Sequence, residues 1–233
     1  MSQGCDIDRC GFQRNSAIES LINGNKSKGL YICLATIILW FNMANEITEI
    51  LKLLIENKQE RFSIRKISLL RKINYKSAYI ALKQLAKIDV VNLEKIGNTT
   101  SCSFNENFND LVFKAEYERR ERLFKNKDFL IIYNQLSELN FPFILLLFGS
   151  YAKGTATKHS DIDLLLISKD EEEKLVSDKL KLLPHDIHLT HVTSDSFIRM
   201  IKNKEFSVGS EAIKKNIILL GIEDYYRLLK NAR

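Results

Sequence analysis

The hydrophobic positions between residues 46 and 104 change from helical to strand-like spacing. Five apolar residues spaced three and four apart predict one helix over 46–57: Ile47, Ile50, Leu51, Leu54 and Ile55. The pattern then predicts a short strand over 62–64, helices over 65–71 and 75–88, and strands over 90–95 and 99–104, the last two joined by a Gly-Asn hairpin turn. The residues of the two later helices that are expected to face inward are Ile67, Leu70, Ala78, Leu82 and Leu85.

The second half of the chain alternates amphipathic helices with short apolar runs. Charged residues dominate 107–127, which predicts a solvated linker helix, and the amphipathic helix that follows ends before Pro142. Apolar runs over 143–148 and 162–167 are too short for helices and predict strands buried on both faces. A helix over 171–182, a strand over 186–192 and helices from Ser194 onward complete the pattern. This alternation predicts an α/β or α+β sheet domain, and we assign the chain to the α+β class.

The composition is that of a globular chain. With 45% hydrophobic and 27% charged residues, it excludes disorder throughout, collagen and a disulfide scaffold. The four cysteines form no Cys-x-x-Cys pair, so we expect reduced thiols, a cytoplasmic protein and no structural zinc site. The apolar run over 30–41 is twelve residues long, short of the roughly 20 that a membrane span needs, so we expect no span. Residues 1–42 are treated as an N-terminal extension, because Met43 directly precedes the first helical pattern and offers a second start.

Positive charge is concentrated in one stretch of the chain. The net charge is +6 overall, whereas Arg61 to Thr100 alone holds nine basic and two acidic residues. Such a basic block is suited to binding a polyanion. Three helices closed by a hairpin, with the basic block on the second and third helices, resemble a winged helix-turn-helix domain, to which we assign residues 43–106.

The resemblance to winged helices implies double-stranded DNA as a partner. In such domains the third helix enters the major groove and other basic groups neutralise phosphates. The residues that the resemblance places at the DNA are Lys76, Ser77, Tyr79, Lys83 and Lys95, with Tyr75, Ile80 and Asn98 beside them. Winged-helix regulators often bind DNA as homodimers. The alternative is a small helical module that docks on protein.

The residues that carry chemistry lie between Gly149 and Ser168. A buried strand leads into the Gly149-Ser150 turn, and after ten further residues Asp161 and Asp163 open the next strand. Side chains two apart on a strand point to one side, so the carboxylates project together and favour a hard divalent cation, with Mg²⁺ as first candidate. Gly149 lets a phosphate approach the backbone, and Ser150 offers a hydroxyl and an N–H. These parts together predict chemistry on a nucleoside triphosphate.

The same segment resembles the nucleotidyltransferase superfamily with the DNA polymerase β fold, in particular the minimal nucleotidyltransferases of archaea and bacteria. The positions that match its signature are Gly149, Ser150, Gly154, Ser160, Asp161, Asp163 and Leu164. The resemblance covers residues 127–229, so we assign residues 128–233 to a nucleotidyltransferase domain, and it implies a small mixed sheet flanked by helices. It implies transfer of a nucleoside monophosphate, usually AMP from ATP, to an acceptor hydroxyl. Asp161 and Asp163 would hold one or two Mg²⁺ ions, and Gly149, Ser150 and Ser160 would bind the nucleotide.

The family's third catalytic carboxylate has two candidate positions in this chain. Asp186, His188 and Thr190 alternate onto one face of the predicted strand, and Asp186 is the strand's one acid. Counting back from the start of the next helix instead places the position nearer His188. We name Asp186 as catalytic together with Asp161 and Asp163, and we keep open the alternative that His188 replaces the acid.

Two functional hypotheses follow. The first is a Mg²⁺-dependent nucleotidyltransferase, and since some members of the resembling family are antitoxins that place AMP on a tyrosine of a partner toxin, a protein acceptor is included. The alternative is a DNA-binding transcriptional regulator with a catalytically silent nucleotidyltransferase domain. The basic block and the departure from the family at His188 motivate the second hypothesis.

Overall fold

The structure, a computed structural model, describes residues 44–203 and 208–232, and Asn45–Arg233 forms one compact unit. The expected N-terminal extension, its apolar run and Met43 lie outside the described residues. No helix in the described part of the chain is long and apolar enough to cross a membrane.

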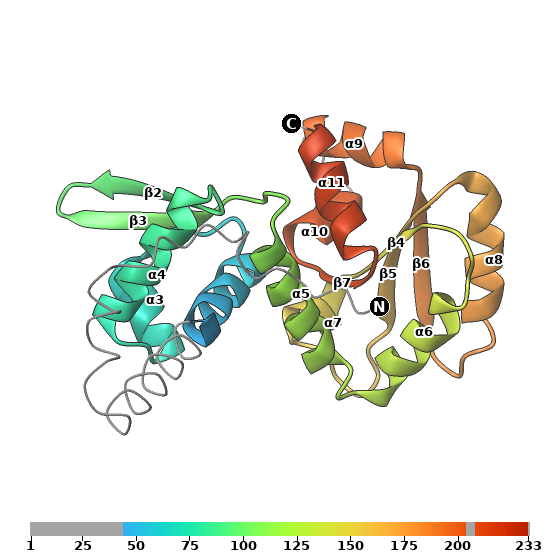
Figure 1. Cartoon of the computed structure of the whole chain (residues 1–233). Coiled ribbons are helices and arrows are strands. Elements are labelled where there is room, and N and C mark those ends of the chain that lie inside the picture. The colour runs from blue at the N-terminus through green and yellow to red at the C-terminus, as the bar shows by residue number, and fades with distance from the viewer. Residues whose placement is uncertain (1–43, 204–207, 233) are drawn as a thin grey trace, which may run out of the picture. The chain divides into compact units, whose positions relative to one another are not determined.

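The first part of the unit combines three helices with an antiparallel sheet (Figure 1). Residues 44–56 are helical, and the elements that follow are β1 (Phe62–Ser63), α3 (Ile64–Arg71), α4 (Tyr75–Lys87), β2 (Val91–Ile96) and β3 (Thr99–Phe104). The three strands are ordered β1-β3-β2. The Ser63 and Asn74 side chains accept hydrogen bonds from the backbone N–H groups of Lys66 and Lys76 and so start α3 and α4. This order of elements confirms the helices and strands predicted over 46–104.

One expected core position in α3 is wrong. Ile67 is buried, but Leu70 is 52% exposed and its neighbour Leu69 is 70% exposed. The helix starts at Ile64, so the repeat of three and four residues selects Ile64, Ile67 and Ser68 for its inner face and leaves Leu70 outside. In α4 the inward positions Ala78, Leu82 and Leu85 are confirmed, each fully buried.

The charged segment is a helix, α5 (Asp110–Leu123), but it is not a solvated linker. Five of its side chains are buried, and two of these are the charged Glu116 and Arg119. Glu116 pairs with Arg119 and accepts a hydrogen bond of 2.8 Å from the Tyr226 hydroxyl, while Arg119 donates one of 2.7 Å to the Asn216 carbonyl. The two buried charges pair with each other. Because this buried face contains charged residues, the pattern of hydrophobic positions does not predict that it is buried.

The second part of the unit contains a four-stranded mixed sheet. Its strands are β4 (Ile144–Leu147), β5 (Ile162–Ile167), β6 (Ile187–Val192) and β7 (Ile217–Leu220). They are ordered β6-β5-β4-β7, with β5 and β6 parallel and the other pairs antiparallel. The strand β7 corrects the expectation of helices alone after Ser194: its four apolar residues are a short strand against β4.

Helices cover both faces of this sheet (Figure 1). Leu145 and Leu147 of β4 pack in one buried cluster with α6 (Lys127–Ser137) and α8 (Asp170–Leu180). Ile144 and Leu146, which point to the opposite face, pack in another with α9 (Ser194–Asn203), α10 (Val208–Lys214) and α11 (Ile222–Ala232). A sheet buried on both faces explains why its strands read as continuous apolar runs.

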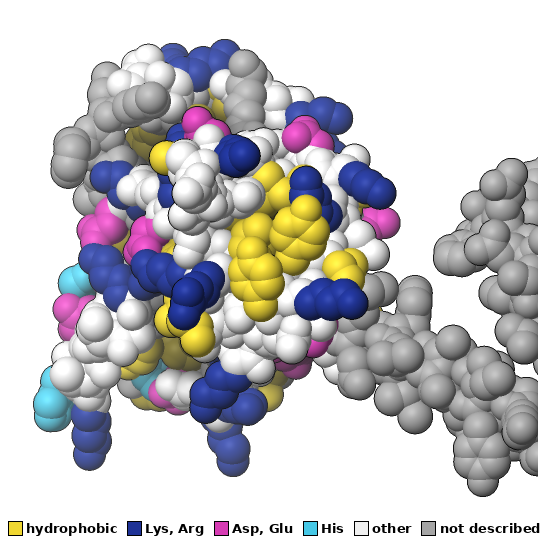
Figure 2. All heavy atoms as spheres, turned by 90° about the vertical axis from the view of Figure 1, so that its left-hand side faces the viewer, with side chains coloured by type: hydrophobic (Ala, Val, Ile, Leu, Met, Phe, Trp, Pro, Cys, Tyr) yellow, Lys and Arg dark blue, Asp and Glu magenta, His cyan; other side chains and the backbone are white. Residues whose placement is uncertain are grey.

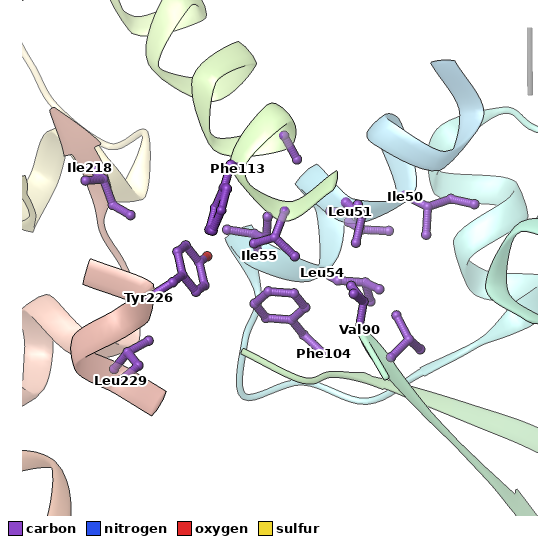
Figure 3. Packing of buried hydrophobic residues seen from close by; sticks show 14 of the residues in the cluster. Ile50, Leu51, Leu54, Ile55, Val90, Phe104, Phe113, Ile218, Tyr226 and Leu229 are labelled. Atoms are coloured by element: carbon purple, nitrogen blue, oxygen red, sulfur yellow. The ribbon is translucent and has the colours of Figure 1, made fainter. Parts of the chain in front are cut away.

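The two parts share a hydrophobic core. Figure 3 shows Phe113 of α5 and Tyr226 of α11 beside Ile55 and Phe104 from the first part. All four belong to one cluster of buried residues, and the rings of Phe113 and Tyr226 lie 5.9 Å apart. The winged-helix and nucleotidyltransferase segments predicted from the sequence are therefore packed together as one unit.

Candidate active site

The Gly149-Ser150 turn lies where β4 leaves the sheet and α7 (Gly149–Lys153) begins. Gly149 has a φ of +68°, which a residue with a side chain rarely adopts. A Cβ at this position would overlap Oδ2 of Asp163 and lie 2.9 Å from its Cγ. Two constraints therefore require glycine here: the positive φ of the backbone and the closeness of the Asp163 carboxylate.

Asp161 and Asp163 lie at the start of β5, as predicted. The Phe148 N–H donates a 3.0 Å hydrogen bond to the Asp163 carbonyl, which fixes the turn against the strand. Burial raises the pKa of the Asp163 carboxyl, nearby Asp161 raises it further, and His188 opposes both. Asp163 is thus a carboxylate whose charge calls for a positive partner.

The two candidates for the family's third carboxylate, Asp186 and His188, lie at the start of the neighbouring strand β6. In the parallel pairing of β5 with β6, Asp163 is the register partner of His188. The His188 Nδ1 atom lies 3.8 Å from Oδ1 of Asp163 and 4.0 Å from Oδ2 of Asp161, and its Nε2 lies 3.9 Å from Oδ1 of Asp186. His188 therefore faces both carboxylates of the pair, and Asp186 lies beside His188 and Asp161.

Among the described residues, one group of side chains converges as metal ligands do. Asp161, Asp186 and His188 each offer one ligand atom, and the three atoms lie within 4.8 Å of one another. This set differs from the expected metal pair Asp161 and Asp163, because it takes Asp161 from directly before β5, Asp186 from directly before β6 and His188 from β6. The sequence could have found it only by assuming the parallel register of the two strands.

Ser150 and Ser160, the two serines predicted to bind the nucleotide, also form hydrogen bonds within the loop. The Ser150 carbonyl accepts a hydrogen bond of 3.0 Å from the Thr155 N–H, and the Ser160 hydroxyl accepts one of 2.8 Å from the Thr157 N–H. These bonds close the loop between α7 and β5. A contact that the sequence did not indicate is the ion pair between Lys153 of α7 and Glu211 of α10.

The residues predicted to contact DNA are mostly exposed and come from α4 and β2. Lys76, Tyr79, Lys83 and Lys95 are exposed and Ser77 is half-buried. The Lys83 ammonium lies 5.7 Å from the centre of the Tyr79 ring. Figure 2 shows hydrophobic side chains gathered on one face of the molecule with Lys and Arg around them. The exposed large hydrophobic residues of α3 and α4 are Leu69, Leu70, Tyr75, Tyr79 and Ile80.

The second part of the chain is thus an α+β domain. At one edge of its sheet, carboxylates and an imidazole converge beside a glycine turn. Residues 128–219 of the chain match a family model described as a nucleotidyltransferase domain. The match supports the nucleotidyltransferase superfamily for this segment and, in general terms, a nucleotidyltransferase reaction.

Other comparisons add little to this match. No curated protein matches the chain. Among solved structures, a mutant of ZitR from Lactococcus lactis in its apo form is 20% identical and covers 68% of this chain and 94% of its own, with a TM-score of 0.27. A score this low does not indicate a shared fold.

Proposed function

We propose that the protein transfers a nucleoside monophosphate, AMP from ATP in the first instance, to an acceptor hydroxyl. The observation that carries the proposal is the convergence of Asp161, Asp163, Asp186 and His188 beside the Gly149 turn, within the segment that matches the nucleotidyltransferase domain. The acceptor oxygen forms a bond to the α-phosphorus, the bond between the α-phosphorus and the bridging oxygen breaks, and pyrophosphate leaves.

The residues of the site fit a divalent cation. Three carboxylates and an imidazole face a common space, and like charges this close are stable together only beside positive charge. Asp161, with Asp163, Asp186 or His188, would hold the ion. When bound, it neutralises phosphate charge and favours ionisation of the acceptor hydroxyl.

The chain's own residues supply binding and proton transfer. The missing side chain at Gly149 leaves room for the Asp163 carboxylate beside the turn, and the Ser150 hydroxyl offers a donor to a phosphate. Asp186 and His188 lie on the exposed side of the carboxylate pair, with side chains 78% and 62% exposed. Either can accept the proton that the acceptor hydroxyl loses.

Label transfer tests this proposal. The full chain is incubated with each nucleoside triphosphate labelled at the α-phosphate, a divalent cation and lysate of the source cell. We expect label on a discrete product, and we expect the double variant Asp161→Asn with Asp163→Asn to lose it. Asp186→Asn and His188→Asn, each alone, then show which residue the reaction requires. A double variant that labels the product as well as the wild type would refute the proposal.

A protein acceptor is the favoured one. The resemblance to antitoxins that place AMP on a partner toxin supports it, as do the exposed hydrophobic side chains of α3 and α4, which offer a protein surface. Incubation with the product of the neighbouring gene should place label on a hydroxyl side chain of that protein. Label found only on small molecules would contradict a protein acceptor.

A second candidate function is DNA binding by a winged helix formed by residues 45–104. Its support is the order of helices and strands, the β1-β3-β2 sheet and the exposed basic residues of α4. A gel shift on the protein's own promoter that weakens with salt and is unchanged in Asp161→Asn would favour it. If this binding occurs without any label transfer, the second domain is catalytically silent.

A further inference from the structure

His188 is surrounded by carboxylates that it does not reach. Its two ring nitrogens lie 3.8 to 4.0 Å from the nearest oxygens of Asp161, Asp163 and Asp186. These separations are too long for hydrogen bonds. They are close to the roughly 3 to 4 Å that separates two ligands bound about 2.1 Å from the same ion. The arrangement therefore resembles a coordination shell more than a hydrogen-bonded network.

The basic side chain beside this group is already in an ion pair. Lys153 of α7 is paired with Glu211 of α10. The side chains of Asp161, Asp186 and His188 are 47%, 78% and 62% exposed, so an ion held between them keeps positions open to water or phosphate. Both features favour an exchangeable cation with open coordination sites.

The donor set determines which cation fits. Mg²⁺ takes oxygen ligands in a near-ideal octahedron, whereas imidazole is a ligand of first-row transition ions and is best suited to Fe²⁺, Ni²⁺, Cu²⁺ and Zn²⁺. An all-carboxylate centre is suited to Mg²⁺, and His188 replaces one oxygen ligand by nitrogen at the register partner of Asp163.

We propose that Asp161, Asp186 and His188 bind a first-row transition ion, for which Mn²⁺ serves as the paramagnetic probe, and that His188 gives this centre a preference for such an ion over Mg²⁺. The inference rests on the proposed nucleotidyl transfer, but it concerns only which residues bind the ion. It assigns His188 a role as ligand in place of the third acid.

The test measures binding and ligation without nucleotide. Calorimetric titration of the full chain with Mn²⁺ and with Mg²⁺ gives the ratio of the two affinities, and pulsed electron paramagnetic resonance of bound Mn²⁺ detects a nitrogen ligand directly. In the wild type we expect one Mn²⁺ per chain, bound about tenfold more tightly than Mg²⁺, with a nitrogen coupling. His188→Asp should abolish the coupling and bring the two affinities to within a few-fold of each other.

The controls separate a ligand from a structural residue. His159→Ala, which removes an exposed imidazole from the loop before β5, should leave the affinity ratio and the nitrogen coupling unchanged. His188→Asn serves as a second variant if His188→Asp does not fold. A wild-type Mn²⁺ spectrum without nitrogen coupling, or an affinity ratio that is the same in the wild type and His188→Asp, overturns the inference.

The inference and the proposed function fail in different ways. Nitrogen coupling that depends on His188, together with no label transfer, overturns the proposed function and supports the ligand assignment. Label transfer with no nitrogen coupling supports the function and overturns the assignment.

Discussion

At the scale of single residues, the site depends on the absence of a Cβ atom at Gly149. Gly149 brings its Cα against the Asp163 carboxylate, and no other amino acid fits both its φ and this approach. Gly154, in the loop that follows, has a similar φ of +74°, but nothing lies within 4 Å of the place that a Cβ would occupy there. The two glycines therefore separate the effect of backbone strain from the effect of crowding the carboxylate.

Gly149→Ala should abolish label transfer, since its methyl group displaces the Asp163 carboxylate. Gly154→Ala should cost about 1 kcal/mol of stability through backbone strain and keep most of the activity. Transfer assays and thermal unfolding of both variants check this. Equal activity in the two variants would show that the approach of Gly149 to Asp163 is unimportant.

At the scale of elements, α5 is a structural helix whose inner face is charged. Arg119→Met leaves Glu116 buried with only the Tyr226 hydroxyl as partner, and losing half of a buried pair typically costs about 3 to 5 kcal/mol. Lys114→Met on the exposed face of the same helix should change stability by less than about 0.5 kcal/mol. Urea unfolding of both variants measures the difference. Similar losses in the two would contradict the buried role of Arg119.

In the proposed winged helix, α4 is the element expected to contact DNA. Replacing Lys76 and Lys83 by alanine should lower the salt dependence of DNA binding by about one unit of slope for each phosphate that is no longer neutralised. Lys174→Ala with Lys181→Ala removes the same charge elsewhere and should leave the slope unchanged. Binding measured at several salt concentrations tests this. An equal change in both double variants would show that only net charge matters.

The success of the sequence prediction differs between elements for physical reasons. The helix over 46–57, α4, β4 and β5 follow from periodicity and run length, and the spacing from Gly149 to Asp163 locates the turn and the carboxylates. Strand β7 was missed because four apolar residues between helices give no periodic signal. The sequence named Asp186 and His188 as alternatives for one position, but it did not predict that both converge with Asp161, because this depends on the pairing register of β5 with β6, which joins segments distant in the chain.

At the scale of the whole molecule, the two parts of the Asn45–Arg233 unit depend on each other. Leu54 and Phe104 from the first part share one buried cluster with Tyr226 and Leu229 from the second (Figure 3). Buried apolar surface shared in this way couples the unfolding of both parts.

Leu54→Ala should cost about 2 to 5 kcal/mol and should lower the protection of β4 and β5 amides as well as those of α4. Leu182→Ala, at a position 77% exposed, is the control and should leave protection unchanged. Hydrogen exchange read by mass spectrometry checks both. Protection of β4 that is unaffected by Leu54→Ala would mean that the two parts unfold independently.

Nucleotidyl transfer is tested most directly by comparing ATP labelled at the α-phosphate with ATP labelled at the γ-phosphate, in the presence of the acceptor fraction and either Mg²⁺ or Mn²⁺. Transfer of a nucleoside monophosphate places the α-label on the acceptor and releases the γ-label as pyrophosphate. The account predicts this result for the wild type and its loss in Asp161→Asn with Asp163→Asn. Appearance of the γ-label on the acceptor, or no labelled product with either ion, would contradict it.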